Sequence, residues 1–169
     1  VVSVAGSVFI RNGNAIHSYY HSSNVAMSNC DFVDNGTALY RQCADNGYRV
    51  QQSIFAENSR TFWYRDPQSG SVFDPLAVTQ SNFYENSDGY VPATTTRVRT
   101  LSVSQNLALD PQFADKDNDN LFLLATSPML LTDARQQTVL IGAYGIAELQ
   151  VPGEDQVVAD ANDAVVSHA

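Results

Sequence analysis

Basic residues are scarce in this chain of 169 residues, which contains a single lysine, Lys116. Nine lysine and arginine residues stand against 18 aspartate and glutamate residues, so the formal net charge is −9 at pH 7. Binding to nucleic acid or to an anionic membrane surface depends on clustered basic side chains. The composition therefore argues against both classes of partner and is compatible with cations or basic partners.

Cysteine is also rare, since only Cys30 and Cys43 are present, and no Cys-x-x-Cys pair indicates a zinc site. Two cysteines fit either one disulfide or two buried thiols. We favour thiols because free cysteine often packs as a small hydrophobe. No run approaches the roughly 18 apolar residues that a membrane-spanning helix needs. No signal peptide is visible, and the first residues look like part of a strand. We therefore expect a mature or excised piece of a longer protein.

A repeat dominates the first half of the chain. The motif Phe-x-x-Asn occurs four times, and its phenylalanines follow one another at spacings of 23, 23 and 28 residues. A small residue stands two positions before each phenylalanine, and an apolar residue stands five positions before it. A weaker fifth unit runs from Leu107 to Phe113. The repeated positions are Phe9 and Asn12, Phe32 and Asn35, Phe55 and Asn58, and Phe83 and Asn86.

Each unit holds short segments with period-two alternation, which is typical of strands with one buried face. A unit of this length, at about 3.3 Å per residue, can circle once and return one strand spacing higher. Stacked units would then pair in parallel and bury one continuous core. The sequence predicts an all-β parallel β-helix, or solenoid, of about five coils with a C-terminal cap. We expect the coils in residues 1–106, the terminal coil and cap in 107–147, and an acidic tail or linker in 148–169.

Two properties explain the recurring asparagine. Asparagine tolerates the left-handed backbone conformation at a turn, and stacked asparagine side chains can hydrogen-bond from coil to coil. Asn35-Gly36-Thr37 also matches the N-glycosylation acceptor pattern. Because Asn35 lies in the repeated column, we expect a turn position there rather than a glycan. Proline, glycine, serine and threonine predict projecting loops at residues 66–71 and 92–97.

The repeats resemble those of right-handed parallel β-helix proteins with the pectate-lyase-like superfold. The Phe-x-x-Asn spacing, followed by Gly13-Asn14-Ala15-Ile16 and Gly36-Thr37-Ala38-Leu39, is similar in particular to the polymorphic outer-membrane protein repeat. This resemblance implies a right-handed coil and an extracellular or cell-surface location. The superfold serves lyases, epimerases, adhesins and other surface proteins, so it does not select a function.

The C-terminal part carries a second resemblance, to the closing segment of many secreted bacterial β-helix proteins. The matching residues are Asp110-Pro111-Gln112-Phe113, Ser127-Pro128 and Ile141-Gly142-Ala143-Tyr144. This copy departs from the pattern at Leu121, where aspartate is usual, and at Gly145, where glutamate is frequent. The resemblance implies that this segment closes the coil.

An outward-facing aromatic column is the first candidate site. His17, Tyr40 and Trp63 each stand eight residues after a repeat phenylalanine, beside residues expected to point inward. At a strand spacing of about 4.8 Å, they would form a strip that suits the apolar faces of sugars. Alternatively, the rings stack on one another and stiffen the sheet, which we favour because exposed aromatics mark a site only when they are contiguous. Three neighbours would extend the same face: Tyr19, Arg65 and Asp66.

Acidic residues at alternate positions, Asp115, Asp117 and Asp119, resemble the first half of a calcium-binding loop. The second half does not match, because Asn120 stands at the position of the turn glycine and Thr126 at the position of the bidentate glutamate. We expect a solvated turn and no cofactor, with calcium as the alternative.

We predict a non-catalytic structural or binding module of a secreted or cell-surface protein, which contacts glycan or another protein. No spacing selects a catalytic set, such as the carboxylate pair about 5–10 Å apart that a glycosidase needs. One alternative is a C-terminal fragment of a polysaccharide-active enzyme of the lyase or epimerase type. Another is a subunit of an extracellular assembly, in which the unpaired strand edges of the open first coil stack on another chain.

Overall fold

The computed structural model describes residues 2–18, 24–41, 47–64, 76–88, 101–132 and 135–145. Within these ranges the protein is all-β, and its one helical element is the short 3₁₀ turn η1 (Lys116–Asn118). The predicted loops at 66–71 and 92–97, Cys43 and the predicted tail at 148–169 lie outside the described residues.

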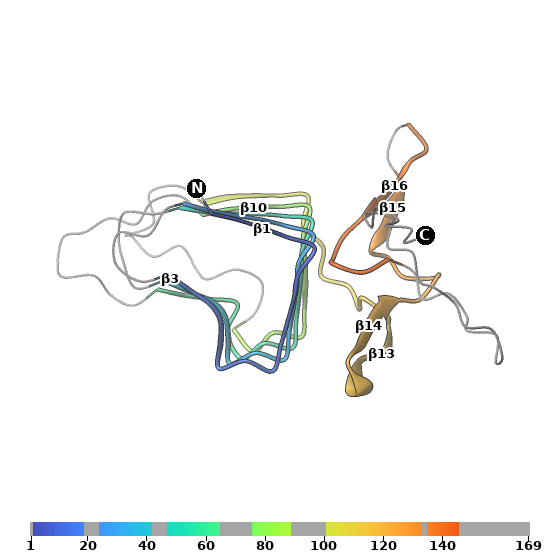
Figure 1. The fold of residues 1–169 in the computed structure, drawn as a ribbon. Coiled ribbons are helices and arrows are strands. Elements are labelled where there is room, and N and C mark those ends of the chain that lie inside the picture. The colour runs from blue at the N-terminus through green and yellow to red at the C-terminus, as the bar shows by residue number, and fades with distance from the viewer. Residues whose placement is uncertain are drawn as a thin grey trace, which may run out of the picture.

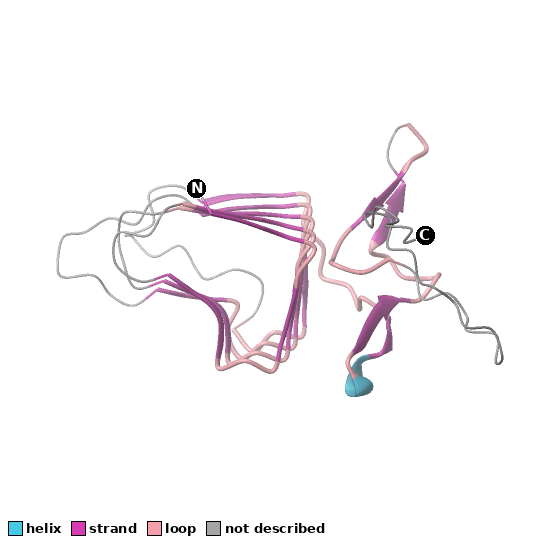
Figure 2. Cartoon of the chain, viewed as in Figure 1, coloured by secondary structure: helices cyan, strands magenta, loops and turns pink. Residues whose placement is uncertain are grey.

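Twelve of the described strands form three parallel sheets, and the chain adds one strand to each sheet in turn (Figures 1 and 2). The first sheet contains β1 (Val2–Ala5), β4 (Val25–Ser28), β7 (Tyr48–Gln51), β10 (Leu76–Thr79) and β12 (Leu101–Ser104). The second contains β2 (Val8–Ile10), β5 (Asp31–Val33), β8 (Ile54–Ala56) and β11 (Asn82–Tyr84). The third contains β3 (Asn14–Ser18), β6 (Thr37–Arg41) and β9 (Phe62–Tyr64).

The register between neighbouring strands follows the sequence repeat. Phe9 pairs with Phe32, Phe32 with Phe55, and Phe55 with Phe83. The additional residues of the third spacing fall between β9 and β10, so the strands on either side stay in register. The predicted parallel pairing of the repeats is therefore confirmed.

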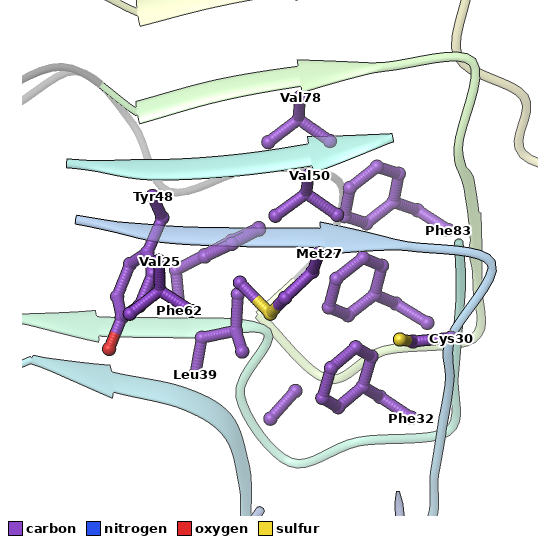
Figure 3. Packing of buried hydrophobic residues seen from close by; sticks show 12 residues of the cluster. Val25, Met27, Cys30, Phe32, Leu39, Tyr48, Val50, Phe62, Val78 and Phe83 are labelled. Carbon is purple, nitrogen blue, oxygen red and sulfur yellow. The ribbon is translucent and has the colours of Figure 1, made fainter. Parts of the chain in front are cut away.

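Columns of side chains that recur from strand to strand fill the interior (Figure 3). The rings of the four repeat phenylalanines stack almost parallel, with centroids 4.9, 4.8 and 5.0 Å apart along the column. Burial of each such ring contributes about 1.5–3 kcal/mol, so this column is a large part of the core. A second column comes from the first sheet and contains Val4, Met27, Val50 and Val78.

A ladder of asparagine side chains lines the corner after the second sheet. Asn35, Asn58 and Asn86 are buried, and each donates its side-chain amide to the carbonyl of the phenylalanine one repeat earlier, at 2.9 Å. The Oδ1 atom of Asn58 accepts from the backbone N–H and the side chain of Asn35, at 3.0 and 2.9 Å. Hydrogen bonding from repeat to repeat by this column is confirmed. Asn35, which is only 1% exposed, occupies the structural turn position that we expected.

The left-handed backbone conformation lies one residue before each asparagine of the ladder. Arg11, Asp34, Glu57 and Glu85 have φ values of 53°, 53°, 57° and 48°, whereas none of the ladder asparagines has a positive φ. The prediction that asparagine itself supplies the left-handed residue is therefore wrong. The preceding residue turns the corner, and the asparagine keeps an ordinary φ while its side chain bonds along the ladder.

Small residues fill the corner between the first and second sheets. The hydroxyls of Ser53 and Ser81 accept the backbone N–H groups of Cys30 and Ser53, each at 3.2 Å. Cys30 lies in the same column as a free, buried thiol, which agrees with the thiol that we favoured. Burial raises the pKa of this thiol above its ordinary value, so it stays protonated at neutral pH.

Two antiparallel strand pairs lie beside the parallel stack (Figure 1). They are β13 (Phe113–Asp115) with β14 (Asn120–Leu123), and β15 (Leu130–Thr132) with β16 (Thr138–Leu140). Leu107 forms a parallel bridge with Asn82, as the fifth unit predicts, and the strands after it lie against the side of the stack. The chain division at residues 106 and 147 stays a prediction.

The second sheet is covered on both of its faces. Its phenylalanines point into the interior, and its opposite face packs against the two strand pairs in a separate apolar cluster. The fully buried members of this cluster are Val33, Ile54 and Ala56 from the sheet, and Leu121, Leu123, Met129 and Ile141 from the strand pairs and their flanking residues.

Gly142 lies in close contact with residues on and beside the second sheet. Its N–H donates to the carbonyl of Gln52 at 2.9 Å, and its φ is +107°. A Cβ atom here would lie 2.6 Å from Oδ1 of Asp31 and 2.7 Å from Cδ1 of Ile54. Both the backbone conformation and the close approach therefore require glycine.

We expect Gly142→Ala to lower the free energy of unfolding by about 2 kcal/mol or more, because alanine adds a clash and backbone strain. Denaturant unfolding monitored by the fluorescence of the single tryptophan measures this change. Gly145→Ala is the matched control, since a Cβ at Gly145 meets nothing within 4 Å. Equal stability of the two variants would show that the segment does not approach the sheet this closely.

Candidate functional site

The predicted aromatic column is present on the third sheet. His17, Tyr40 and Trp63 lie on β3, β6 and β9 in direct register, beside the inward-facing Ile16, Leu39 and Phe62. The rings of His17 and Tyr40 stack with centroids 4.4 Å apart, and those of Tyr40 and Trp63 with centroids 4.7 Å apart. The sequence therefore located the members of the column and their spacing correctly.

The middle ring of the column is buried, whereas the two outer rings are exposed. Tyr40 is only 7% exposed between its two neighbours, whereas Trp63 is 41% exposed. The guanidinium carbon of Arg60 lies over the Trp63 ring at 4.5 Å from its centroid. This geometry favours mutual stacking as the role of Tyr40. The exposed indole beside a cation is the part of the column that is best placed to contact a ligand.

Three residues of the predicted ligand-binding face, Tyr19, Arg65 and Asp66, lie outside the described residues. The extension of the face by these three residues stays a prediction. Arg60 joins the candidate site because its guanidinium lies over the Trp63 ring. Arg60 was not included in the face predicted from the sequence. Its position three residues before Trp63 was the available signal.

The three aspartates proposed for calcium lie in and around η1, where hydrogen bonds and ion pairs involve two of their carboxylates. Asp119 forms an ion pair with Arg11 at 2.8 Å, and Asp115 accepts from the side chain of Asn118 at 2.8 Å. Lys116 in the same turn forms an ion pair with Glu57. Across the described ranges, no group of three His, Cys, Asp or Glu side chains is placed to hold a metal ion. The ion pairs of Asp119 and Lys116 hold η1 against Arg11 and Glu57, at the corner after the second sheet.

A polar cluster inside the stack was not predicted. Arg41 is 1% exposed, and Ser18 and Tyr48 are also buried. The hydroxyl of Tyr48 donates to Oγ of Ser18 at 2.8 Å and is 3.2 Å from the carbonyl oxygen of Tyr40. Burial raises the pKa of Tyr48, so the phenol stays neutral. The signal was available, because Arg41 stands two residues after the inward-facing Leu39 and therefore shares its face.

Asp31 is the second buried charged residue that the sequence did not reveal. It lies on the outer face of β5, next to Val8 and Ile54 in the sheet, beneath the C-terminal segment. Its Oδ1 accepts the backbone N–H of Ala143 at 3.0 Å. Burial raises its pKa from 3.8 to about 7, and the hydrogen bond from Ala143 only partly offsets this rise. Asp31 is therefore a titrating group within the contact between segment and sheet.

Searches of protein-family profiles, curated proteins and solved structures find no match to this chain. The assignment of a site therefore depends on the geometry described above. None of the helices in the described ranges has the length and apolar character needed to cross a membrane.

Proposed function

We propose that the three parallel sheets form a right-handed parallel β-helix, which serves as a non-catalytic structural and binding module of a secreted or cell-surface protein. Two observations support the coil. The chain visits the three sheets in a constant order, and the same side chains stack at each visit. The resemblance of the repeats to secreted β-helix proteins supports the right-handed coil and the extracellular setting.

The observation that carries the binding proposal is the exposed indole of Trp63 beside the guanidinium of Arg60. An indole provides a large, rigid apolar surface against which the C–H face of a sugar ring packs. A guanidinium provides several donors in a fixed plane, which suit a sugar hydroxyl or carboxylate. Together, the two side chains fit one glycan residue lying on the outside of the third sheet. The stack below them, with Tyr40 buried, holds the indole in place.

We expect Trp63→Ala to weaken glycan binding roughly tenfold, because it removes the apolar surface and one partner of Arg60. Calorimetric titration with a panel of neutral and uronate-containing oligosaccharides measures the affinity. Leu124→Ala is the matched control, since Leu124 is 43% exposed but lies in the C-terminal segment. Unchanged affinity in Trp63→Ala would contradict the site.

The same oligosaccharides also test the enzymatic alternative. Samples kept with the native protein are examined for new reducing ends and for unsaturated products. Turnover of any member of the panel would replace the binding proposal with a catalytic one.

A further inference from the structure

Two apolar cores lie on opposite faces of the second sheet and share no residue. One fills the interior of the parallel stack. The other lies between the outer face of the second sheet and the C-terminal segment, whose described residues are 107–132 and 135–145. Val33, Ile54 and Ala56 are its fully buried members from the sheet. Because the interior of the stack is packed without the C-terminal segment, the segment and the stack are able to separate as two units.

The end of the C-terminal segment is held to the second sheet by a few polar contacts. Besides the contact of Gly142 described above, the side-chain amide of Asn29 donates to the carbonyl of Leu140 at 2.8 Å. The Asp31 carboxylate accepts the backbone N–H of Ala143 at 3.0 Å. Asp31 is the ionisable member of this set, so its protonation state decides whether a charge lies within the contact.

Asp31 is surrounded by apolar groups. Its register partners in the second sheet are Val8 and Ile54, and residues 141–143 of the C-terminal segment contact its carboxylate. Asp31 is only 1% exposed. Among the described residues, its side chain accepts one hydrogen bond, from Ala143, and forms no ion pair. A buried carboxyl group with so few partners is much more stable when it is protonated than when it is charged.

The described elements around Asp31 hold no group that neutralises its charge. The Cys30 thiol lies on the interior side of the sheet. Arg11 and Lys116 form ion pairs with other carboxylates, namely those of Asp34, Asp119 and Glu57. Within the described ranges, the remaining ionisable groups of these elements form no ion pair with Asp31, and they are Asp110, Asp115, Asp117, Arg135 and Tyr144. Loss of the proton from Asp31 therefore leaves an unpaired charge inside the contact.

From this geometry we infer that β15, β16 and residues 141–143 form a pH-dependent cover over the outer face of the second sheet. The cover is closed while Asp31 is protonated. It opens when Asp31 gives up its proton to water and the carboxylate becomes hydrated. Opening leaves the parallel stack folded and exposes the apolar side chains of Val33, Ile54 and Ala56.

A rise in pH favours the open state. The pKa of Asp31 is about 7 in the closed protein, against an ordinary value of 3.8, so the closed state binds the proton more tightly than the open state does. Opening therefore becomes more favourable between about pH 4 and about pH 7, with no further change above that range. If release restores the ordinary pKa, the open population rises roughly a hundredfold from about pH 5 to about pH 8.

The two methionines of the chain report on the two cores separately. Met129 is completely buried in the core beneath the cover, and Met27 is 2% exposed in the interior of the stack. Peroxide converts methionine to its sulfoxide when the sulfur becomes accessible. Mass spectrometry of peptides from the full chain measures this rate for each methionine, relative to the rate of the same residue in denaturant at the same pH.

Complete unfolding also releases Asp31, so the relative rates of both methionines rise with pH. An independent cover makes the relative rate of Met129 at least about tenfold higher than that of Met27. We also expect the Met129 rate to rise roughly a hundredfold from about pH 5 to about pH 8.

Asp31→Asn keeps an acceptor for the N–H of Ala143 but cannot ionise, so its Met129 rate is expected to change less than about twofold over this range. Asp117→Asn, at an exposed position in η1, is the matched control and keeps the wild-type rise. Three results would each overturn the inference: equal relative rates for Met129 and Met27, a Met129 rate that does not depend on pH, or a rise that persists in Asp31→Asn.

Discussion

Replacement of Asn58 by alanine is expected to lower the free energy of unfolding by about 3 kcal/mol or more. Asn58 is completely buried in the middle of the ladder. Its loss removes the acceptor for the backbone N–H and side chain of Asn35, and the donor to the carbonyl of Phe32. Each buried polar group left without a partner costs about 1–3 kcal/mol. Denaturant unfolding of the wild type and of Asn58→Ala measures this difference in the free energy of unfolding.

Asn12→Ala is the matched control for this prediction. Asn12 occupies the same column at its exposed end, and its side chain donates to Ile10 and Asn35. Water can replace these bonds, so we expect a loss of about 1 kcal/mol or less. Similar losses in the two variants would show that the ladder does not act as a continuous buried network.

Replacement of Asp31 by asparagine is expected to raise stability at neutral pH and to flatten its dependence on pH. The pKa of Asp31 is about 7 in the folded protein, against an ordinary value of 3.8. The folded state therefore binds the proton more tightly than the unfolded chain does. It follows that Asp31 makes the free energy of unfolding fall as pH rises from about 4 to about 7, by up to about 4 kcal/mol, with no further change above that range.

Thermal or denaturant unfolding of the wild type and Asp31→Asn between pH 4 and pH 8 measures this difference. The amide of asparagine can still accept the N–H of Ala143, so the variant removes the charge and keeps the contact. Asp117→Asn, at an exposed position in η1, is the matched control and is expected to keep the wild-type profile. If Asp31→Asn retains the fall in stability toward pH 7, Asp31 is not buried in a contact with the C-terminal segment.

The parallel stack could be predicted from sequence because one register satisfies every column. Phe9, Phe32, Phe55 and Phe83 fall in line only when the units are stacked at the repeat spacing, and the same shift aligns the asparagines. A slip by one residue would turn all of these side chains to the opposite face. The aromatic column of the third sheet follows from the same alignment.

The contact between the C-terminal segment and the second sheet could not be derived from the repeat, because it has no period. A signal was nevertheless present in the second strands of the units. Val8-Phe9-Ile10 and Ile54-Phe55-Ala56 are apolar at every position, which is typical of strands buried on both faces. Asp31 interrupts this pattern, and its burial depends on a segment more than 100 residues away in the chain.

The positions of the left-handed residues at the corners, and the exposure of each ring in the aromatic column, also could not be predicted from the sequence. Asparagine is a frequent left-handed residue, but the corner belongs to Glu57 and its equivalents, because the asparagine is committed to the ladder. Stacking at strand spacing was predicted for Tyr40. Whether a stacked ring stays accessible depends on what covers its edges, and Tyr40 is buried.

A nuclear Overhauser spectrum of the full chain tests the parallel stack most directly. The parallel stack predicts contacts between strands one repeat apart, such as the backbone of Ile54 with that of Cys30 and Asp31, and of Ile54 with Asn82. It also predicts ring contacts along the column from Phe9 to Phe83. Backbone contacts between consecutive strands, such as β1 with β2 or β4 with β5, would instead indicate antiparallel hairpins and would contradict the stack.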